Sequence, residues 1–436
     1  MKIVKRIVLV LGVLLVIASC IEELETEVFS ETDLPDILIV EATLTDEFKQ
    51  HDIKLSLLDS LVDLETDTIF NPFIPPRDVE IDLVKHESGA SVQVTTSNGM
   101  TYDFFEASPG LYRSNQEFAV ASDVDYQLSI RRQNGKEYSS DPMKIEGMAT
   151  IGNIYAERTV SDLGTVGVGI FIDSETLSGN TGNLRFTYDE THKIIAPNWT
   201  SFQFELTNYD PCALPVPTYD LEIVERTTES RVCFSTEASQ EIVQSQLDFS
   251  SGQNLERFMV RFISQDDYKI ANRYSIEVQQ MVSGAQAYGF YEQLDNFSRS
   301  DNLFSQIQPG LLGGNISMAD GSQDGVIGFF DVVSVSKSRL FFNYDDFFEG
   351  EELPDYPVDC GLHSSPESHA SYCASGLLAN DCPQSIIERV DIGVISYVGV
   401  NGLNLGTCPG PYLYVATPCG DCTRLGSNVV PEFWEE

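Results

Sequence analysis

Residues 126–140 read YQLSIRRQNGKEYSS, and this stretch decides the fold class. Every second residue from Tyr126 to Ile130 is apolar, and this two-residue period is typical of a β-strand with one buried face. The dipeptide Asn134-Gly135 follows, and it favours a tight hairpin turn because both of its residues tolerate positive φ. The chain then returns through residues that favour a strand. The stretch therefore predicts an antiparallel β-hairpin.

The same pattern recurs on the N-terminal side of this hairpin. Further short segments with the composition or alternation of strands lie at residues 37–44, 79–83, 89–94, 100–105 and 111–112. Asn98-Gly99 supplies a second tight turn between two of them. About seven strands at this spacing predict an immunoglobulin-like β-sandwich over residues 33–148.

The second half of the chain is also strand-rich, but one segment has a helical period. Ala287, Tyr291 and Leu294 recur at the spacing of one helix face, which predicts a helix over residues 284–297. We expect the aromatic side chains of this face to pack in a core. At about 100 to 200 residues per domain, the 436 residues correspond to two or three domains. We therefore predict a mainly β protein in which a larger β-rich domain, residues 149–436, follows the sandwich.

The N-terminus has the features of a bacterial secretion signal. A basic start precedes an unbroken apolar run at residues 7–17, which is shorter than the roughly 20 residues of a bilayer span. Small residues then lead directly to Cys20, as in a lipobox. We predict that residues 1–19 are a lipoprotein signal peptide and that Cys20 carries the lipid, palmitate included. The alternative is an ordinary cleaved signal in which Cys20 has no role.

A short acidic segment follows this cysteine. Residues 20–32 form the predicted tether, and its first acidic side chains are Glu22, Glu23 and Glu25. Acidic residues directly after a lipidated cysteine resemble the surface-export signal of lipoproteins in Bacteroidota, and the alternative is a solvated linker. We expect the protein to be anchored in the outer membrane by its lipid and to face the cell exterior.

A second acidic stretch interrupts the predicted sandwich. Residues 59–76 contain several carboxylates and prolines, and they predict a loop on the sandwich rim. This loop contains two Asp-Ser/Thr-apolar triplets, centred on Ser60 and Thr68, that resemble an O-glycosylation sequon of some Bacteroidota. Such triplets also occur by chance, so both positions are candidate glycosylation sites and no more.

The chain as a whole is strongly acidic. Its 67 Asp and Glu residues against 26 Lys and Arg residues give a formal net charge of -41. Such a surface repels phosphate backbones and anionic headgroups, so we expect no nucleic-acid partner and no membrane binding through a basic patch. Solubility explains the charge, and attraction to cations or to a basic partner is the alternative.

Nine cysteines indicate an oxidising compartment. Setting Cys20 aside leaves an even number, which predicts up to four disulfides behind a secretion signal. These cysteines are Cys212, Cys233, Cys360, Cys373, Cys382, Cys408, Cys419 and Cys422. Cys212 and Cys233 are close in the sequence, so we expect them to pair. The other six are expected to pair among themselves and to hold residues 360–422, a segment rich in Gly, Pro and Ser that has little core of its own.

The residues that could carry chemistry form no catalytic pattern. His363, Glu367 and His369 could bind a metal, but their spacing fits neither a helical pair nor a zinc-protease motif. Residues 320–325 resemble the start of a calcium loop, but Asp331 stands where the closing glutamate is usual, and a tight acidic turn explains them better. With no nucleophile elbow and no phosphate loop in the sequence, we predict no catalytic residue, no metal and no cofactor.

Several short motifs together resemble one known family. They occur in order along nearly the whole mature chain, at residues 38–41, 89–92, 110–112, 273–278, 287–288, 328–330, 419–422 and 431–434. This arrangement is similar to domain-of-unknown-function family four-two-four-nine, whose members are Bacteroidota outer-membrane lipoproteins. The resemblance implies a partner lipoprotein of a TonB-dependent outer-membrane transporter. The family has no defined ligand residues, so it assigns no site in this chain.

These observations lead to one expected function and two alternatives. We expect a non-catalytic accessory binding subunit of a TonB-dependent β-barrel transporter, acting in cargo capture or uptake. Its contact surface is expected on the loop at residues 59–76 and on residues 360–408. The main alternative is a structural accessory subunit of an outer-membrane secretion or assembly machine. A secreted hydrolase is a remote alternative, because the groups that hydrolysis requires are not apparent in the sequence.

Overall fold

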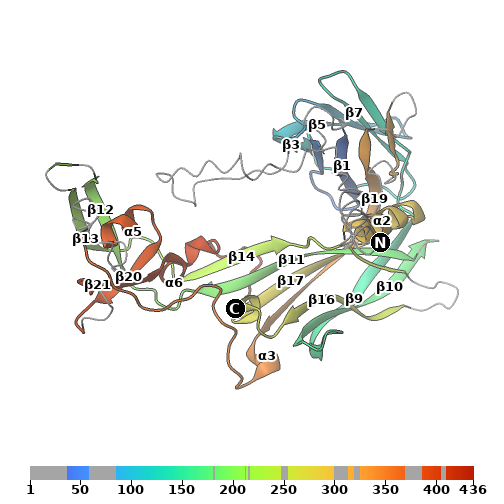
Figure 1. Cartoon of the computed structure of the whole chain (residues 1–436). Coiled ribbons are helices and arrows are strands. Elements are labelled where there is room, and N and C mark those ends of the chain that lie inside the picture. The colour runs from blue at the N-terminus through green and yellow to red at the C-terminus, as the bar shows by residue number, and fades with distance from the viewer. Residues whose placement is uncertain are drawn as a thin grey trace, which may run out of the picture.

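The computed structural model describes residues 37–57, 85–179, 182–211, 213–214, 217–246, 254–298, 313–318, 325–368, 385–403 and 409–436. Strands dominate this part of the chain, and the predicted mainly β class is confirmed. Figure 1 shows three units, which we call the N-terminal unit, the central unit and the disulfide-linked lobe. Among the described residues, no helix has the length and apolar character needed to span a bilayer.

The N-terminal unit is a curled sheet. Its strands are hydrogen-bonded in the order β19-β1-β2-β6-β5-β4-β7-β8-β18, with the short β3 beside β2. The strands are β1 Leu38–Thr45, β2 Asp52–Leu57, β3 Lys85–His86, β4 Ser91–Thr96, β5 Thr101–Ser108, β6 Leu111–Ser114, β7 Tyr126–Arg131, β8 Glu137–Ser140, β18 Ile316–Met318 and β19 Val326–Asn343. The last two strands come from the second half of the chain, so this unit is not one continuous stretch of sequence.

Both predicted Asn-Gly turns are present in this unit. Asn98-Gly99 connects β4 to β5, where Thr95 pairs with Thr101, and Gly99 has a φ of 86°. Gly135 has a φ of 85° between β7 and β8. Positive φ is unfavourable for residues with a Cβ, which explains the glycine at the second position of each turn. The turns fix the strand register, and the register directs one set of alternating side chains inward.

Strand β19 connects the N-terminal unit to the central unit. Its first half runs parallel to β1, and its second half runs antiparallel to β17, Arg273–Ser283. At the change of partner, Asp46 accepts hydrogen bonds from the Ser334 hydroxyl at 2.7 Å and from the Val335 N–H at 2.9 Å. Asp46 directly follows β1. Its carboxylate therefore supplies hydrogen-bond acceptors to β19 at the point where β19 no longer pairs with β1.

The curled sheet closes on itself between β18 and β19. The Asn315 side chain donates to the carbonyl of Phe330 and accepts from the N–H of the same residue, both at 2.8 Å. An amide side chain therefore acts as the strand partner at this seam. The approach is close, because a Cβ on Gly314 would lie 1.7 Å from the carbonyl oxygen of Gly328. Glycine is required at position 314, since any side chain would collide with the facing backbone.

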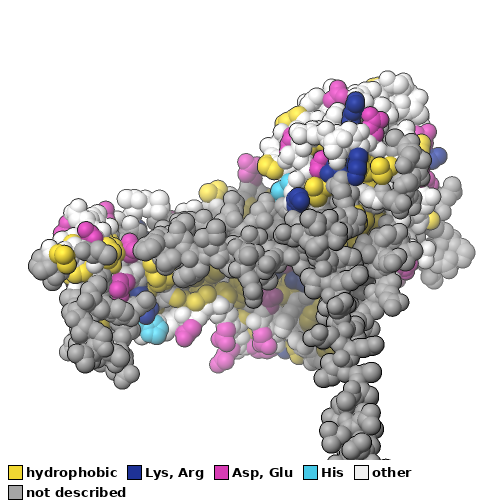
Figure 2. Space-filling view, turned by 45° about the horizontal axis from the view of Figure 1, so that its top comes forward, with side chains coloured by type: hydrophobic (Ala, Val, Ile, Leu, Met, Phe, Trp, Pro, Cys, Tyr) yellow, Lys and Arg dark blue, Asp and Glu magenta, His cyan; other side chains and the backbone are white. Residues whose placement is uncertain are grey.

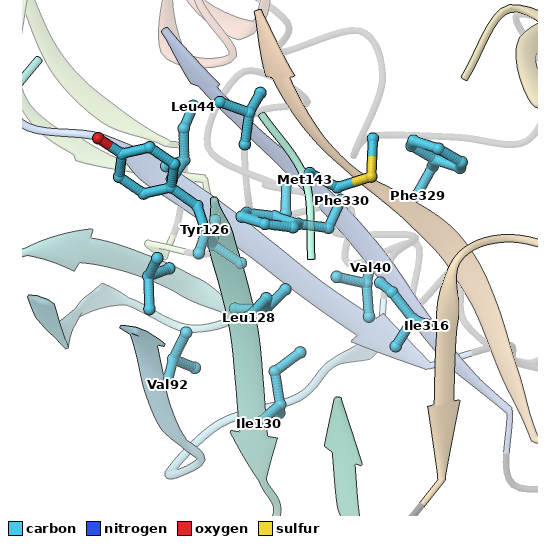
Figure 3. Packing of buried hydrophobic residues seen from close by; sticks show 14 of the residues in the cluster. Val40, Leu44, Val92, Tyr126, Leu128, Ile130, Met143, Ile316, Phe329 and Phe330 are labelled. Atoms are coloured by element: carbon cyan, nitrogen blue, oxygen red, sulfur yellow. The ribbon is translucent and has the colours of Figure 1, made fainter. Parts of the chain in front are cut away.

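The core of the N-terminal unit lies inside the curl. The alternating residues Tyr126, Leu128 and Ile130 of the opening stretch are almost fully buried, in the same cluster as Phe330 of β19. Figure 3 shows these side chains converging from strands that are far apart in the sequence. Burying one large apolar side chain contributes about 1.5–3 kcal/mol, so β19 supplies a substantial part of the stability of this unit.

The central unit consists of two packed sheets. One sheet continues from β19 through β17 and β11 to β14, with β15 beside β11, and the other has the order β16-β10-β9. The new strands are β9 Gly147–Val160, β10 Val166–Gly179, β11 Asn183–Ile195, β14 Val232–Ala238, β15 Val243–Gln246 and β16 Leu255–Ser264. Ile170, Phe186 and Ile276 are fully buried in the core of this unit. The short elements η3 Tyr268–Ile270 and α3 Asp345–Phe348 also contribute to the core.

The helix predicted from apolar spacing is confirmed. Helix α2, Ala285–Ser298, packs Ala287 and Phe290 into the core of the N-terminal unit, and Tyr291 and Leu294 lie against the same core. Its aromatic face therefore packs against this core, as expected, and Phe290, Tyr291 and Leu294 also line a cavity. Because α2 follows β17 directly, it lies at the junction between the N-terminal and central units (Figure 1).

The disulfide-linked lobe contains two hairpins and several short helices. Its elements are β12 Phe202–Asp210, β13 Thr218–Glu225, α5 Ile386–Asp391, β20 Ile395–Val400, β21 Tyr412–Ala416, α6 Thr417–Gly420 and η5 Cys422–Arg424. β12 pairs with β13, and β20 pairs with β21. The lobe projects from the end of the long central strands, on the side away from the N-terminal unit (Figure 1). Two-stranded sheets are only marginally stable alone, so further contacts are needed to hold this lobe.

Candidate functional site

Most of the site residues predicted from the sequence lie outside the described residues. These are Cys20, Glu22, Glu23, Glu25, Ser60, Thr68, Cys212, Cys373, Cys382 and Cys408, together with His369 and residues 320–324 of the candidate calcium loop. Lipidation, surface export and glycosylation therefore stay predictions. The structure does place the other four cysteines, and all four are in disulfides that brace the lobe.

Two disulfides hold the lobe. Cys233 of β14 is bonded to Cys422, and Cys360 is bonded to Cys419, with Cα–Cα distances of 5.7 and 5.5 Å. The predicted Cys212–Cys233 pair is therefore wrong, and so is the prediction that the last six cysteines pair only among themselves. The prediction used the short sequence separation of Cys212 and Cys233. In the fold, the C-terminal segment returns beside β14 and forms a β-bridge with it, which brings Cys422 to Cys233.

A buried arginine is the polar centre of the lobe. Arg226 has 7% of its side chain exposed, and it donates to the Asp421 carboxylate at 3.0 Å. It also donates to the carbonyl oxygens of Thr200 and Gly420, each at 3.1 Å. The acceptors come from the segment before β12 and from the end of α6. One guanidinium therefore ties the β12–β13 hairpin to the C-terminal segment, between the cysteines Cys419 and Cys422 of the two disulfides.

Aromatic side chains fix the two hairpins of the lobe against each other. Phe204 of β12 packs edge-to-face on Tyr397 of β20 and on Tyr412 of β21, with ring centroids 5.3 and 5.8 Å apart. The two tyrosines are themselves in edge contact at 6.0 Å. Such pairs contribute about 0.5–1.5 kcal/mol each beyond the area that they bury. The disulfides, Arg226 and this cluster together make the lobe a braced platform.

The exposed side chains of this platform include large apolar residues and carboxylates. Leu214, Val400 and Leu403 are 93%, 70% and 80% exposed. Glu205 of β12 and Glu222 of β13 face each other directly, which is unfavourable in the absence of a positive charge. Figure 2 shows hydrophobic side chains beside acidic ones on this lobe. Large apolar side chains exposed among charged ones make this lobe a candidate protein-binding surface.

The candidate metal ligands do not converge in the part of the chain that the structure describes. His363 pairs through its backbone with Tyr414, and Glu367 accepts a hydrogen bond from the Tyr219 hydroxyl at 3.0 Å. Asp331 is buried and hydrogen-bonded within the fold, so it is not available to close a calcium loop. Within the described ranges, no three His, Cys, Asp or Glu side chains form a metal-binding group. The expected absence of a metal, a cofactor and an enzymatic activity stays a prediction.

A buried charge network in the central unit was not predicted from the sequence. Glu190 accepts hydrogen bonds from Lys269 at 2.6 Å and from the Tyr274 hydroxyl at 2.7 Å, and it also pairs with Arg261. Burial raises the pKa of Glu190, but these partners outweigh burial and lower the pKa overall. His192 is fully buried nearby without a partner for either ring nitrogen, and burial lowers its pKa to about 4. Residues 190 and 192 lie on the same face of β11, because side chains alternate between the two faces of a strand. This two-residue period is the sequence signal from which the burial of both residues could have been predicted.

The fold and the lobe define a class of protein: a β-rich scaffold with a disulfide-braced, partly apolar surface. The family model for Domain of unknown function (DUF4249) matches residues 21–339, and the chain belongs to this family. The matched region ends within β19, before most of the disulfide-linked lobe.

Other comparisons add little to this assignment. No curated protein matches the chain. Among solved structures, a mutant of the Salmonella alpha-2-macroglobulin is similar with a TM-score of 0.14 and 10% identity, over 57% of this chain and 14% of that chain. A likeness at that level supports no conclusion about fold or function.

Proposed function

We propose that this chain is a non-catalytic, surface-exposed outer-membrane lipoprotein that serves as an accessory binding subunit of a TonB-dependent transporter. Family membership, the lipobox that ends at Cys20 and the acidic tether behind it support the proposal. The structural observation that carries it is the disulfide-linked lobe, where exposed apolar side chains lie on a covalently braced platform. Disulfides lower the entropy cost of holding such a surface ready for a partner.

The position of the lobe supports docking at a distance from the anchor. The tether leads into β1, so the lipid is attached through the N-terminal unit. Residues 20–36 can extend over at most about 60 Å. The lobe lies at the other end of the molecule from β1 (Figure 1). A protein anchored at one end and apolar at the other is suited to contact a neighbouring barrel in the same membrane.

The docking surface is tested by placing charges on its apolar side chains. The double variant Val400→Asp and Leu403→Asp changes two side chains that are 70% and 80% exposed, so the fold should be retained. The matched control is Val160→Asp and Leu163→Asp, at 59% and 95% exposure on the β9–β10 side of the central unit. We expect the lobe variant to lose co-purification with an outer-membrane barrel by about tenfold or more, because apolar anchors dominate interface energies.

The readout is affinity purification from detergent-solubilised outer membrane, followed by mass spectrometry of the co-purified proteins. Wild type and the control should recover the same plugged β-barrel. Equal recovery by a folded lobe variant would contradict the assignment of the surface. Recovery of a secretion or assembly complex in place of a transporter would contradict the proposed function and favour the structural alternative.

The membrane anchor is tested separately. Cys20→Ala should abolish incorporation of radiolabelled palmitate and release the protein from the outer-membrane fraction. Equal labelling of wild type and variant would show that this cysteine is not the lipidated residue. Replacing Glu22, Glu23 and Glu25 with alanine should then protect the protein from proteinase added to intact cells, if the tether is the export signal.

A further inference from the structure

A cavity lies at the junction between the N-terminal and central units, apart from the disulfide-linked lobe. Its volume is about 500 Å³, which is within the range of small-molecule binding pockets. Its walls come from β1, β2, β11, β19, α2 and the loop between β14 and β15. Most of the wall is apolar, and it includes Ile39, Phe186, Phe290, Leu294, Ile327 and Phe329.

One buried cation lines this apolar cavity. The side chain of Arg185 is 11% exposed, and its Nε and Nη2 atoms have no hydrogen-bond partner. The guanidinium stacks on the ring of Tyr291, with 4.2 Å between Cζ and the ring centroid. Stacking stabilises the cation but satisfies none of the N–H groups in its plane. Nε and Nη2 are both enclosed, and a buried guanidinium with unsatisfied donors is unfavourable, so a ligand acceptor would stabilise Arg185 once the side chain turns these donors toward the cavity.

The nearest carboxylate, Asp331, forms an ion pair with this guanidinium but no hydrogen bond. Asp331 lies 3.9 Å from Arg185 Nη2, which is beyond hydrogen-bond distance. Its two oxygens accept instead from the Ser283 hydroxyl at 3.2 Å and from the Val332 N–H at 3.0 Å. Burial raises the pKa of Asp331, and the charge of Arg185 partly offsets this effect.

Three carboxylates line the cavity wall: Glu41 and Asp52 already have cationic partners, and Glu241 is exposed to solvent. Glu41 lies 3.8 Å from Lys54 Nζ, and Asp52 accepts two hydrogen bonds from Arg113 at 2.7 and 2.8 Å. Lys54, the other wall cation, is 67% exposed and so is hydrated, which leaves Arg185 as the buried wall cation. The carboxylates nearby disfavour a ligand with several negative charges, whereas a single negative charge is matched by Arg185.

We propose that the junction cavity binds a small apolar monocarboxylate. The carboxylate accepts hydrogen bonds from the Arg185 guanidinium, and the apolar body packs against the side chains of β1, β19 and α2. Charge-assisted hydrogen bonds of this kind are among the strongest that a protein forms. The assignment does not depend on the lobe or on the transporter.

The ligand class is tested by isothermal titration calorimetry. The protein is the full-length chain with Cys20→Ala, so that no attached acyl chain competes for the cavity. The probes are decanoate, decanol and decylamine at about 0.15 M salt, where long-range charge effects are screened. Decanoate should bind at least about tenfold more tightly than either analogue. N-acetyl-leucyl-leucine with a free carboxylate is compared with decanoate to distinguish a peptide source from an acyl source of the same chemistry.

Three variants locate the binding. Arg185→Gln should weaken decanoate binding by about 10- to 100-fold and leave decanol unaffected. Leu294→Trp should fill the cavity and weaken decanoate and decanol alike, without changing any charge. Arg131→Gln is the matched control, because Arg131 is an exposed residue paired with Glu137 and its loss changes the net charge equally. Circular dichroism of each variant verifies the fold.

Three results would overturn the proposal. Decanoate and N-acetyl-leucyl-leucine could both fail to bind, decanoate could bind no better than decanol, or the folded Arg185→Gln variant could bind like wild type. In any of these cases Arg185 would be a packing residue of the junction, stabilised by Tyr291 and by the ion pair with Asp331.

Discussion

The N-terminal sequence region should not fold without strands from the second half of the chain. The test is a fragment of residues 33–148, the predicted sandwich, which lacks β18 and β19. These strands bury Ile316, Val326, Phe330 and Val332 in the N-terminal core. At about 1.5–3 kcal/mol for each side chain, the fragment loses about 6–12 kcal/mol. That loss is comparable to the whole stability of a typical domain, which is about 5–15 kcal/mol.

The assay compares this fragment with one that carries the missing strands. In the second fragment a short glycine-serine linker joins residue 148 to residues 313–333, which is feasible because β18 lies antiparallel to β8. Far-UV circular dichroism in urea should show a cooperative transition for the joined fragment and none for the short one. The short fragment should also aggregate, since the edge of β1 is then exposed. A cooperative transition of the short fragment at the same urea midpoint would refute the reasoning.

Point variants of β19 test the same idea in the full chain. Phe330→Ala and Phe342→Ala change the same residue type on the same strand, at 0% and 4% exposure, but in different units. Each should cost about 3–5 kcal/mol. Both tryptophans, Trp199 and Trp434, lie outside the N-terminal unit, so their fluorescence reports the central unit and the lobe. If Phe330→Ala also shifts the fluorescence midpoint in urea, the shared strand couples the two units.

Three further outcomes are expected. Burial lowers the pKa of His192 to about 4 from an ordinary value of 6.5. The free energy of unfolding should therefore fall by about 3 kcal/mol as the pH is lowered from 6.5 to about 4. His192→Phe should remove this pH dependence in urea titrations. Loss of the Cys233–Cys422 disulfide, which closes a loop of 189 residues, should cost about 5 kcal/mol, and an unchanged urea midpoint of the double serine variant would contradict this. Asn315→Ala should cost about 2–3 kcal/mol, because it removes two buried hydrogen bonds at the sheet seam; a thermal melt like that of wild type would argue against the seam.

Features determined by local sequence could be predicted. The Asn98-Gly99 and Asn134-Gly135 turns depend on two adjacent residues, and helix α2 depends on apolar spacing within four turns. The mainly β class follows from the same alternation repeated along the chain. In each case the physical cause lies within a few residues of its effect.

Features determined by contacts between distant residues could not be predicted. The pairing of β1 with β19 joins residues almost three hundred positions apart. The alternating pattern of each strand predicts a strand but does not identify which other strand it pairs with. The disulfide partner of Cys233 was missed for the same reason, since the return of the C-terminal segment beside β14 is a property of the folded chain. Arg185 and Arg226 were missed as well, because their importance arises only from what surrounds them.

Both candidate sites are positioned by strand β11. Arg185 lies near its start, at the junction cavity, and Ile194 near its end pairs with Cys233 of the lobe disulfide. A change that shifted the register of β11 would therefore disturb the cavity and the lobe together. Side-chain changes such as Arg185→Gln and Val400→Asp leave that backbone pairing intact. Arg185→Gln should therefore lose ligand binding but not barrel binding, and Val400→Asp should lose barrel binding but not ligand binding. A variant that loses both would indicate damage to the shared strand rather than to either site.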